Sequence, residues 1–311
     1  MIRDSFSKVL VVGAKGTVGS EAARALLERG ATVRVLIRSK DESGALARCE
    51  LVLGNLRDDA AIRRALAGMQ AAFYVSPHEP DEEDLAERFV KACESMRVRL
   101  VFVGVHVDAP TRFGRALRRF LFGRLLPHYR PKFRISERVR RAKADPIVLM
   151  PTNFFQNDEV FREQILGGAF TQPFERPINR VDVRDIGVAA ARACIDATLP
   201  SGVYPLVGPE SLDASTCANV WSRELGRVVR YQRDAERRLF DAGVRATLTG
   251  KKRDDFLASY TALSKIELPT RAVELARTTR LLGRPPTSYR EYVRDTAHRW
   301  QSSTEEAHAA Q

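Results

Sequence analysis

Cysteine and histidine are scarce in this 311-residue sequence, and neither residue is grouped. The four cysteines are Cys49, Cys93, Cys194 and Cys217. No two of them have the spacing of a zinc site or of a disulfide framework, and the five histidines are equally dispersed. We therefore expect no metal site, and we expect reduced thiols, as in a cytoplasmic protein.

Long apolar runs are missing as well. None approaches the roughly 20 residues that a membrane-spanning helix needs, and the first residues, MIRDSFSK, lack the apolar core of a signal peptide. Hydrophobic residues make up 44% of the chain and charged residues 29%, values typical of a globular protein. A chain of this length accommodates one elaborated α/β domain or two lobes.

Acidic residues are nearly absent from one segment, residues 111–143. The segment contains ten arginines and two lysines against the single acid Glu137, a net charge of +11, whereas the whole chain carries +12. Apolar residues recur within it at helical spacing: Phe113, Ala116, Leu117, Phe120, Leu121 and Leu125. This pattern predicts a cationic amphipathic helix.

Several interpretations of this basic segment stay open. In the first, the charged side of the helix is solvated and its apolar stripe packs on the core. In the others, the helix forms a lid over an apolar or anionic substrate, or it contacts a membrane surface or an acidic protein. Nucleic acid is not expected as a partner, because no reading module such as a helix-turn-helix accompanies the charge.

The most informative feature that is present is a glycine-rich loop within residues 9–38. An apolar run ends at Val12, three glycines follow at three-residue spacing, and a helical pattern leads to a second strand that ends at Arg38. This order of strand, loop, helix and strand is typical of a dinucleotide site, in which the helix N-terminus faces the pyrophosphate. The loop residues expected to contact the cofactor are Gly13, Lys15, Gly16, Thr17, Val18 and Gly19.

The end of the second strand indicates which dinucleotide binds. An NAD site needs an acidic residue there for the ribose hydroxyls, but the chain has Arg38, Ser39 and Lys40 and no acid before Asp41. Arginine holds a 2′-phosphate with two parallel hydrogen bonds, and Lys15 adds a second positive charge. We therefore expect NADP(H) rather than NAD(H), the alternative being that these basic residues are solvated surface groups.

Strand and helix patterns alternate through the first half of the chain. Expected strands are 51–53, 71–75, 100–105 and 146–150, and expected helices are 60–67, 85–96 and 135–144. This alternation predicts an α/β fold with a Rossmann-type, doubly wound parallel sheet. Short strands at 168–170 and 203–207 follow among helices at 185–196 and 215–225, and residues 235–300 are mostly helical.

We expect a dinucleotide-binding domain over residues 1–151 and a smaller, mixed α/β substrate lobe over 152–300. Strands or helices of the second segment are allowed to return to the first domain. Residues 301–311 are expected to form a flexible tail. In such folds the ligand lies at the carboxyl ends of the strands, so we expect the active cleft between the lobes.

Segments along nearly the whole chain resemble the NmrA-like family, an atypical branch of the short-chain dehydrogenase/reductases. The similar segments are the glycine loop with Arg38, residues 53–58, 71–77, 149–157, 180–193 and 202–231, and Lys132. The resemblance implies a Rossmann-like NADP-binding lobe and a small lobe that closes over the nicotinamide. Members of the family include quinone and isoflavone-type reductases, and also redox-sensing regulators that bind the cofactor without turning it over.

The resemblance also implies further cofactor contacts. Asn55, where the family commonly has aspartate, and Leu56 would line the adenine. Ser76 and Pro77 would lie under the ribose and nicotinamide. Phe154 and Phe155 would form a wall of the nicotinamide and substrate pocket, although two aromatic residues after a strand are equally typical of a core.

Catalytic residues follow from the same resemblance. The usual Tyr-x-x-x-Lys motif keeps its lysine, Lys132, which would hold the ribose, but has His128 at the tyrosine position; the usual serine is replaced in residues 104–106. Imidazole donates protons near neutral pH, so His128 is a candidate proton donor, the alternative being a loop histidine without a role. Tyr129 would reach the site only if the loop shifts in register.

Two functions are consistent with these residues. The first is an NADPH-dependent oxidoreductase that transfers hydride to a quinone, an aromatic or another conjugated carbonyl; the hydroquinone anion that forms from a quinone can be protonated by solvent. The second is a non-catalytic NADP(H)-binding redox sensor that acts through a protein partner. Monomer and homodimer both stay open.

Overall fold

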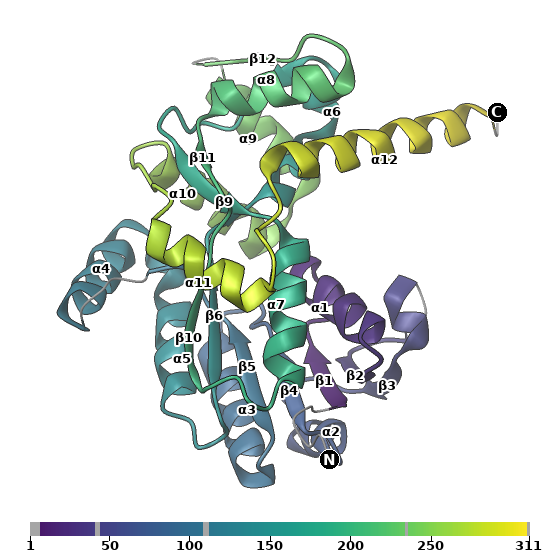
Figure 1. Cartoon of the computed structure of the whole chain (residues 1–311), viewed down its shortest axis with the longest axis vertical. Coiled ribbons are helices and arrows are strands. Elements are labelled where there is room, and N and C mark those ends of the chain that lie inside the picture. Colours follow the sequence, from purple (N-terminus) through teal and green to yellow (C-terminus); the bar gives the residue numbers. More distant parts are fainter. Residues whose placement is uncertain (1–6, 41–43, 108–111, 234–235, 310–311) are drawn as a thin grey trace. The chain divides into compact units, whose positions relative to one another are not determined.

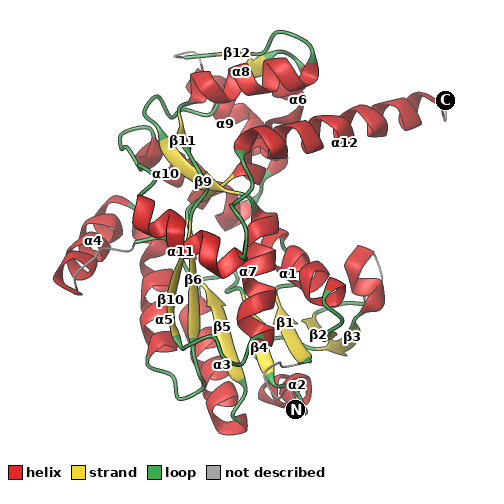
Figure 2. Ribbon diagram, in the orientation of Figure 1, coloured by secondary structure: helices red, strands yellow, loops and turns green. Residues whose placement is uncertain are grey.

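The computed structural model describes residues 7–40, 44–107, 112–233 and 236–309. The chain divides into two compact units (Figures 1 and 2). Unit 1 consists of Met1–Pro151, Val183–Leu206 and Ala276–Arg284. Unit 2 consists of Thr152–Asp182, Val207–Leu275 and Pro285–Gln311. The first segment of unit 1 thus ends at the predicted boundary, and two later segments return to it.

Unit 1 contains a seven-stranded parallel sheet in the order β10-β6-β5-β4-β1-β2-β3. Its strands are β1 (Lys8–Val12), β2 (Thr32–Ile37), β3 (Glu50–Leu53), β4 (Ala71–Tyr74), β5 (Arg99–Val103), β6 (Ile147–Pro151) and β10 (Gly202–Leu206). The central strands are buried along nearly their whole length, as expected for a parallel sheet covered on both faces. The predicted α/β fold class is confirmed.

Helices cover both faces of this sheet. One face packs against α2 (Asp59–Leu66), α3 (Glu82–Met96) and α5 (Arg130–Arg140). The other packs against α1 (Thr17–Glu28) and α7 (Val183–Ile195). Unit 1 also contains α4 (Arg112–Leu125) and two short 3-10 turns, η1 (Gly44–Arg48) and η2 (Pro127–Tyr129).

The sequence pattern placed α7 and β10 in the segment of the second lobe and allowed elements of that segment to return to the first domain; these two elements return to unit 1. β10 pairs with β6 as an edge strand of the main sheet, and α7 packs closely on α1. A Cβ atom added to Gly187 of α7 would lie 2.6 Å from the carbonyl oxygen of Glu21 in α1. The two elements follow a segment of unit 2 in the chain, so their order along the sequence did not reveal which core they join.

Unit 2 is built from helices and two small sheets. The sheets have the orders β11-β9-β7 and β12-β8. Their strands are β7 (Asn153–Phe154), β8 (Ala169–Phe170), β9 (Ile178–Val181), β11 (Ser211–Leu212) and β12 (Arg230–Tyr231). The helical elements are η3 (Phe155–Phe161), α6 (Arg162–Leu166), α8 (Ala214–Leu225), α9 (Glu236–Thr247), α10 (Gly250–Leu263) and α12 (Tyr289–Ala309), and α11 (Ala272–Leu282) begins in this unit.

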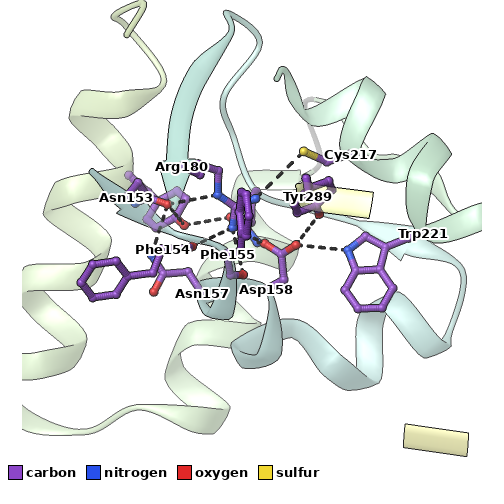
Figure 3. A network of polar contacts seen from close by, with 11 residues as sticks. Asn153, Phe154, Phe155, Asn157, Asp158, Arg180, Cys217, Trp221 and Tyr289 are labelled. Carbon is purple, nitrogen blue, oxygen red and sulfur yellow. Dashed lines mark hydrogen bonds and ion pairs between the residues drawn. The ribbon is translucent and has the colours of Figure 1, made fainter. Parts of the chain in front are cut away.

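The core of unit 2 contains a buried ion pair, shown in Figure 3. Arg180 of β9 and Asp158 of η3 are both fully buried, and Arg180 Nη2 lies 2.5 Å from Asp158 Oδ1. Asp158 also accepts hydrogen bonds from Gln172 Nε2 at 2.5 Å, from Trp221 Nε1 at 3.1 Å and from the hydroxyl of Tyr289. The carboxylate therefore has several partners in an environment without water, which is the condition for a stable buried charge.

Arg180 links this ion pair to the surrounding backbone and rings. Its guanidinium donates to the carbonyl oxygens of Phe154 and Phe155, at 2.9 and 3.1 Å. It also lies 5.5 Å from the ring centroid of Phe174 and 5.4 Å from that of Tyr289. Burial is the largest single influence and lowers the pKa of Arg180, but the carboxylate of Asp158 together with Tyr260, Tyr289 and Cys217 outweighs it, and the pKa is raised. Arg180 and Asp158 thus form a polar centre for the unit 2 core.

The segment 301–309, where a flexible tail was predicted, is helical; its flexibility stays a prediction. Helix α12 continues to Ala309, and residues 310–311 lie outside the described residues. The segment TEEAHA is rich in glutamate and alanine, which favour helix and allow α12 to extend.

The basic segment forms two helices: α4, where the cationic amphipathic helix was predicted, and α5, which begins at Arg130, five residues before the expected helix at 135–144. Thr111 and the side chains of Phe113, Arg112, Arg115, Arg118 and Arg119 lie outside the described part of the structure. The apolar side chains described on α4 are exposed: Leu117, Phe120, Leu121 and Leu125. The interpretation in which this stripe packs on the core is therefore wrong for these four residues.

Arginines of α5 pair with acids of the neighbouring helix α3. Arg138 Nε lies 2.7 Å from Glu87 Oε2, and its Nη2 lies 2.9 Å from Glu94 Oε2. Arg134 pairs with Glu83 at 3.0 Å. Part of the positive charge of the basic segment is thus neutralised by tertiary contacts, which a count along the sequence does not reveal.

One of these pairs gives a pH-dependent contribution to stability. The hydrogen bond from Arg138 lowers the pKa of Glu94 below its ordinary value near 4.5. A carboxylate with a depressed pKa stabilises the fold above that value, and the contribution is lost as the pH falls. We expect Glu94→Gln to reduce the difference in unfolding free energy between pH 7 and pH 3 by less than about 1 kcal/mol, because both side chains of the pair are still partly exposed to solvent.

Urea unfolding at both pH values measures this difference. The exposed Glu267 of unit 2 provides a control, since Glu267→Gln is expected to leave the difference unchanged. An equal effect of the two substitutions would show that the Arg138 contact makes no specific contribution.

Candidate functional site

The glycine loop lies between the carboxyl end of β1 and the start of α1. Gly13 has a positive φ of 87°, which favours glycine, and its carbonyl oxygen accepts a hydrogen bond from Gly16 N at 2.9 Å. Gly16 precedes α1 in an extended conformation, and no side chain caps the helix there. The first N–H groups of α1 are therefore available to an anionic ligand, which the helix dipole favours.

Gly19 leaves no room for a larger residue, and Gly16 leaves little. A Cβ atom on Gly19 would lie 2.1 Å from the carbonyl oxygen of Gly13, so α1 packs directly against the loop. A Cβ atom on Gly16 would lie 3.3 Å from the same oxygen. Thr17 and Val18 form the first turn of α1. This geometry matches that predicted for a pyrophosphate loop.

The loop lies at the topological switch point of the sheet. From β1, the chain continues to β2 and β3 on one side, whereas β4, β5 and β6 follow on the other. Ligands of open parallel sheets bind where the strand order reverses, beyond the carboxyl ends of the strands. The two loops at this point touch, because a Cβ atom on Gly13 would lie 3.2 Å from Cβ of Val75, just after β4.

The turn after β4 is held by Lys132. The sequence placed this residue ahead of a helix, but it lies in the first turn of α5. The helix begins before Lys132 because Pro131 is well tolerated at a helix start. Lys132 Nζ donates to Ser76 Oγ at 2.5 Å and to the carbonyl oxygens of Ser76 and Pro77 at 3.0 and 3.3 Å. The structure thus brings together three of the predicted site residues.

Glu82, the first residue of α3, completes this group. Its Oε2 lies 2.6 Å from Lys132 Nζ, and both side chains are buried. Within the described residues, Glu82 Oε1 has no hydrogen-bond partner, and neither has the buried hydroxyl of Tyr74. Burial and the negative charge of Glu82 both raise the pKa of Tyr74. Sequence reasoning had not identified Glu82 as a site residue, although its position at the start of the helix that follows β4 was a usable signal.

Basic residues gather at the carboxyl end of β2. Arg38 follows β2 directly, its side chain is 77% exposed, and its Nη1 lies 3.5 Å from Glu79 Oε1. Glu79 also binds Arg57, whose Nη2 lies 2.5 Å from Glu79 Oε2. Lys15 Nζ donates to Ser39 Oγ at 3.4 Å, which joins the glycine loop to this strand end. Sequence reasoning had not identified Arg57 and Glu79, because their pairing depends on the fold.

The residues predicted to line the adenine have different environments. Asn55 is exposed, and its Oδ1 accepts a hydrogen bond from Arg57 N at 2.8 Å. Leu56 is buried in the core of unit 1 beneath α2 and β2. Their contact with a nucleotide stays a prediction.

The two aromatic residues after β6 belong to unit 2. Phe155 is fully buried and packs on Tyr289 and Tyr292, at centroid distances of 5.1 and 5.4 Å. Phe155 thus has the surroundings of a core residue, and its contact with the nicotinamide stays a prediction. Phe154 is half-buried in β7.

His128 lies outside helix α5. It belongs to η2, is half-buried and faces Tyr129 at a ring-centroid distance of 4.4 Å. Lys132 and His128 keep the predicted four-residue spacing, but they lie in different helical elements. The role of His128 as a proton donor stays a prediction.

Among the described residues, no group of three or more histidine, cysteine or acidic side chains could hold a metal ion. Likewise, none of the described helices combines the length and apolar character needed to cross a membrane.

The glycine loop, the parallel sheet and the switch point beside the loop define a Rossmann-type fold of the dinucleotide-binding class. The sequence profile of the NmrA-like family matches residues 5–249. The chain belongs to this family, as the resemblance had indicated.

Individual proteins resemble the chain at lower identity. It is 28% identical over 231 residues to an NAD(P)H azoreductase of Xenophilus azovorans, a match that covers 72% of this chain and 76% of that protein. The NADPH-dependent quinone oxidoreductase of Escherichia coli, complexed with NADPH, has a TM-score of 0.73 at 19% identity, covering 92% of this chain and 98% of that one. The negative transcriptional regulator NmrA, in complex with NAD, has a TM-score of 0.71 at 15% identity, covering 96% and 98%. The two structural likenesses show the shared fold.

Proposed function

We propose that this protein is an NADP(H)-dependent oxidoreductase that reduces a quinone or another conjugated carbonyl compound. The observation that carries the proposal is the glycine loop at the switch point, with Arg38 at the end of β2. The names of the azoreductase and of the quinone oxidoreductase support reduction as the type of reaction.

The residues present fit a phosphorylated dinucleotide. Positions 13, 16 and 19 of the loop are glycines, and a Cβ atom at any of them would lie close to backbone atoms or to Val75. Because these side chains are absent, backbone N–H groups can approach a pyrophosphate. Arg38 and Lys15 supply positive charge on the side of the 2′-phosphate. Ser76 and Pro77, beside the loop, would lie along the nicotinamide half. When bound, the nicotinamide supplies a hydride.

Arg38 is the residue that we expect to distinguish NADPH from NADH. Arg38→Ala is expected to weaken NADPH binding by about tenfold or more, the value of a lost charge-assisted contact, while NADH binding changes little. Titration of nicotinamide fluorescence with both cofactors measures this. Arg64→Ala, which removes an exposed arginine of α2, provides the control. Equal losses for the two cofactors would show that Arg38 does not contact the 2′-phosphate.

Protonation of the product does not require a dedicated acid for this class of substrate. A quinone that accepts hydride becomes a delocalised anion, which solvent can protonate, so the absence of the usual tyrosine is compatible with turnover. His128 is a proposed donor, and its half-buried position in η2 leaves its imidazole within reach of solvent.

NADPH oxidation against a panel of quinones and enones tests the proposed function. We expect saturable, acceptor-dependent loss of the NADPH absorbance. Tight NADPH binding without turnover of any acceptor would contradict the enzyme and support the alternative, a redox sensor. A contact of the basic segment with an acidic protein or a membrane surface stays a prediction, as does the choice between monomer and homodimer.

A further inference from the structure

All three hydrogens of the Lys132 ammonium group are used in hydrogen bonds to oxygens of the protein. It carries three N–H donors, and four oxygens lie within 3.3 Å of it: Ser76 Oγ, the carbonyl oxygens of Ser76 and Pro77, and Glu82 Oε2. Contact with a nucleotide ribose would require Lys132 to release one of these oxygens in a buried site, where a lost hydrogen bond is costly.

Glu82 binds Lys132 although one of its own carboxylate oxygens lacks a hydrogen-bond partner among the described residues. One of its carboxylate oxygens binds Lys132, and within the described residues the other has no hydrogen-bond partner although the residue is 1% exposed. Buried carboxylates usually satisfy both oxygens, and an exception calls for a functional explanation. A pair of this kind contributes little net stability but is very sensitive to the removal of one partner.

The turn that this pair holds is part of the switch point. Val75, which contacts Gly13 of the glycine loop, directly precedes Ser76. The pair joins α5, through Lys132, to the first residue of α3, and the turn lies between β4 and α3. Any shift of the turn therefore changes the position of the backbone beside the glycine loop.

We infer that Lys132 is a positioning residue: with Glu82 as its fixed counter-ion, it holds the Ser76–Pro77 turn against the glycine loop and does not itself contact the bound nucleotide. The effect on cofactor binding rests on the proposed function, whereas the effect on the turn does not. The role differs from the ribose contact that the resemblance implied for Lys132.

The test uses Glu82→Gln, Lys132→Met and the double variant of the full chain. A matched control pair lies one and two residues further along the same helices, where Arg134 and Glu83 form an exposed ion pair 3.0 Å long. The control variants are Glu83→Gln, Arg134→Met and their combination. Hydrogen exchange of peptides covering residues 75–81 reports on the turn, and titration with NADPH reports on cofactor binding.

Each single substitution at the buried pair is expected to accelerate exchange over residues 75–81 and to weaken NADPH binding by about tenfold, because it leaves an unpaired charge or a loose turn. The double variant is expected to bind NADPH more tightly than Lys132→Met alone, since Glu82 is then no longer a buried charge without a counter-ion. The control variants are expected to leave exchange over residues 75–81 and NADPH affinity unchanged.

The alternatives give different results. If Lys132 acts by contacting the nucleotide directly, Lys132→Met weakens NADPH binding while exchange over residues 75–81 stays unchanged, and the inference is wrong. If the unsubstituted protein fails to bind NADPH while exchange responds as expected, the proposed function is wrong and the positioning role of Lys132 stands.

Discussion

Replacing Asp158 with alanine is expected to lower the free energy of unfolding by about 3–5 kcal/mol, the usual cost of breaking a buried ion pair. The substitution leaves the guanidinium of Arg180 fully buried without its counter-ion. It also removes the acceptor of Trp221 Nε1 and of the Tyr289 hydroxyl. Figure 3 shows how these donors converge on one carboxylate. Urea unfolding, followed by circular dichroism, measures the change.

An exposed aspartate of the same unit provides the control. Asp254 lies on α10 with a side chain that is 61% exposed and pairs with the neighbouring Arg253. Asp254→Ala is expected to change the free energy of unfolding by less than about 0.5 kcal/mol. If Asp158→Ala were equally mild, the buried network would not be the polar centre of unit 2.

Gly19→Ala is expected to abolish measurable NADPH binding. The added Cβ atom would lie 2.1 Å from the carbonyl oxygen of Gly13, a contact with backbone that no side-chain rotation relieves. The start of α1 must then move away from β1, and the N–H groups that face a pyrophosphate move with it. Binding is measured by the change in NADPH fluorescence, after circular dichroism has established that the variant is folded.

Gly202→Ala is the matched glycine control. A Cβ atom at this position in β10 would meet only a ring carbon of Tyr204 at 3.7 Å, an ordinary van der Waals distance. This variant is expected to bind NADPH like the unsubstituted protein. Retention of NADPH affinity in Gly19→Ala would mean that the nucleotide does not depend on the close approach of α1 to the loop.

The local parts of the fold could be predicted from the sequence. The unit from β1 through α1 to Arg38 is contiguous, so glycine spacing and apolar periodicity define it without information from distant residues. The same holds for the alternating elements through β6. These local signals were sufficient to predict the fold class, which the sheet confirms, and the family, which the sequence profile confirms.

The remaining features depend on contacts between distant segments. The pairing of β10 with β6 joins strands that are separated by a segment of unit 2. The contacts of Lys132 with Ser76 and Glu82 join residues that are 56 and 50 positions apart in the sequence. The charge count along the sequence was also incomplete, because Arg134 and Arg138 of α5 pair with acids of α3, outside their own segment. The sequence alone can identify such residues as candidates, but it cannot show which of them contact one another in the fold.

A crystal structure of the NADPH complex tests the central claim most directly. The account predicts the pyrophosphate against the N–H groups at the start of α1, the 2′-phosphate beside Arg38, and the nicotinamide half along Ser76 and Pro77, with Lys132 still bound to Glu82. A nucleotide bound away from the carboxyl ends of β1 and β4, or a 2′-phosphate remote from Arg38, would contradict it.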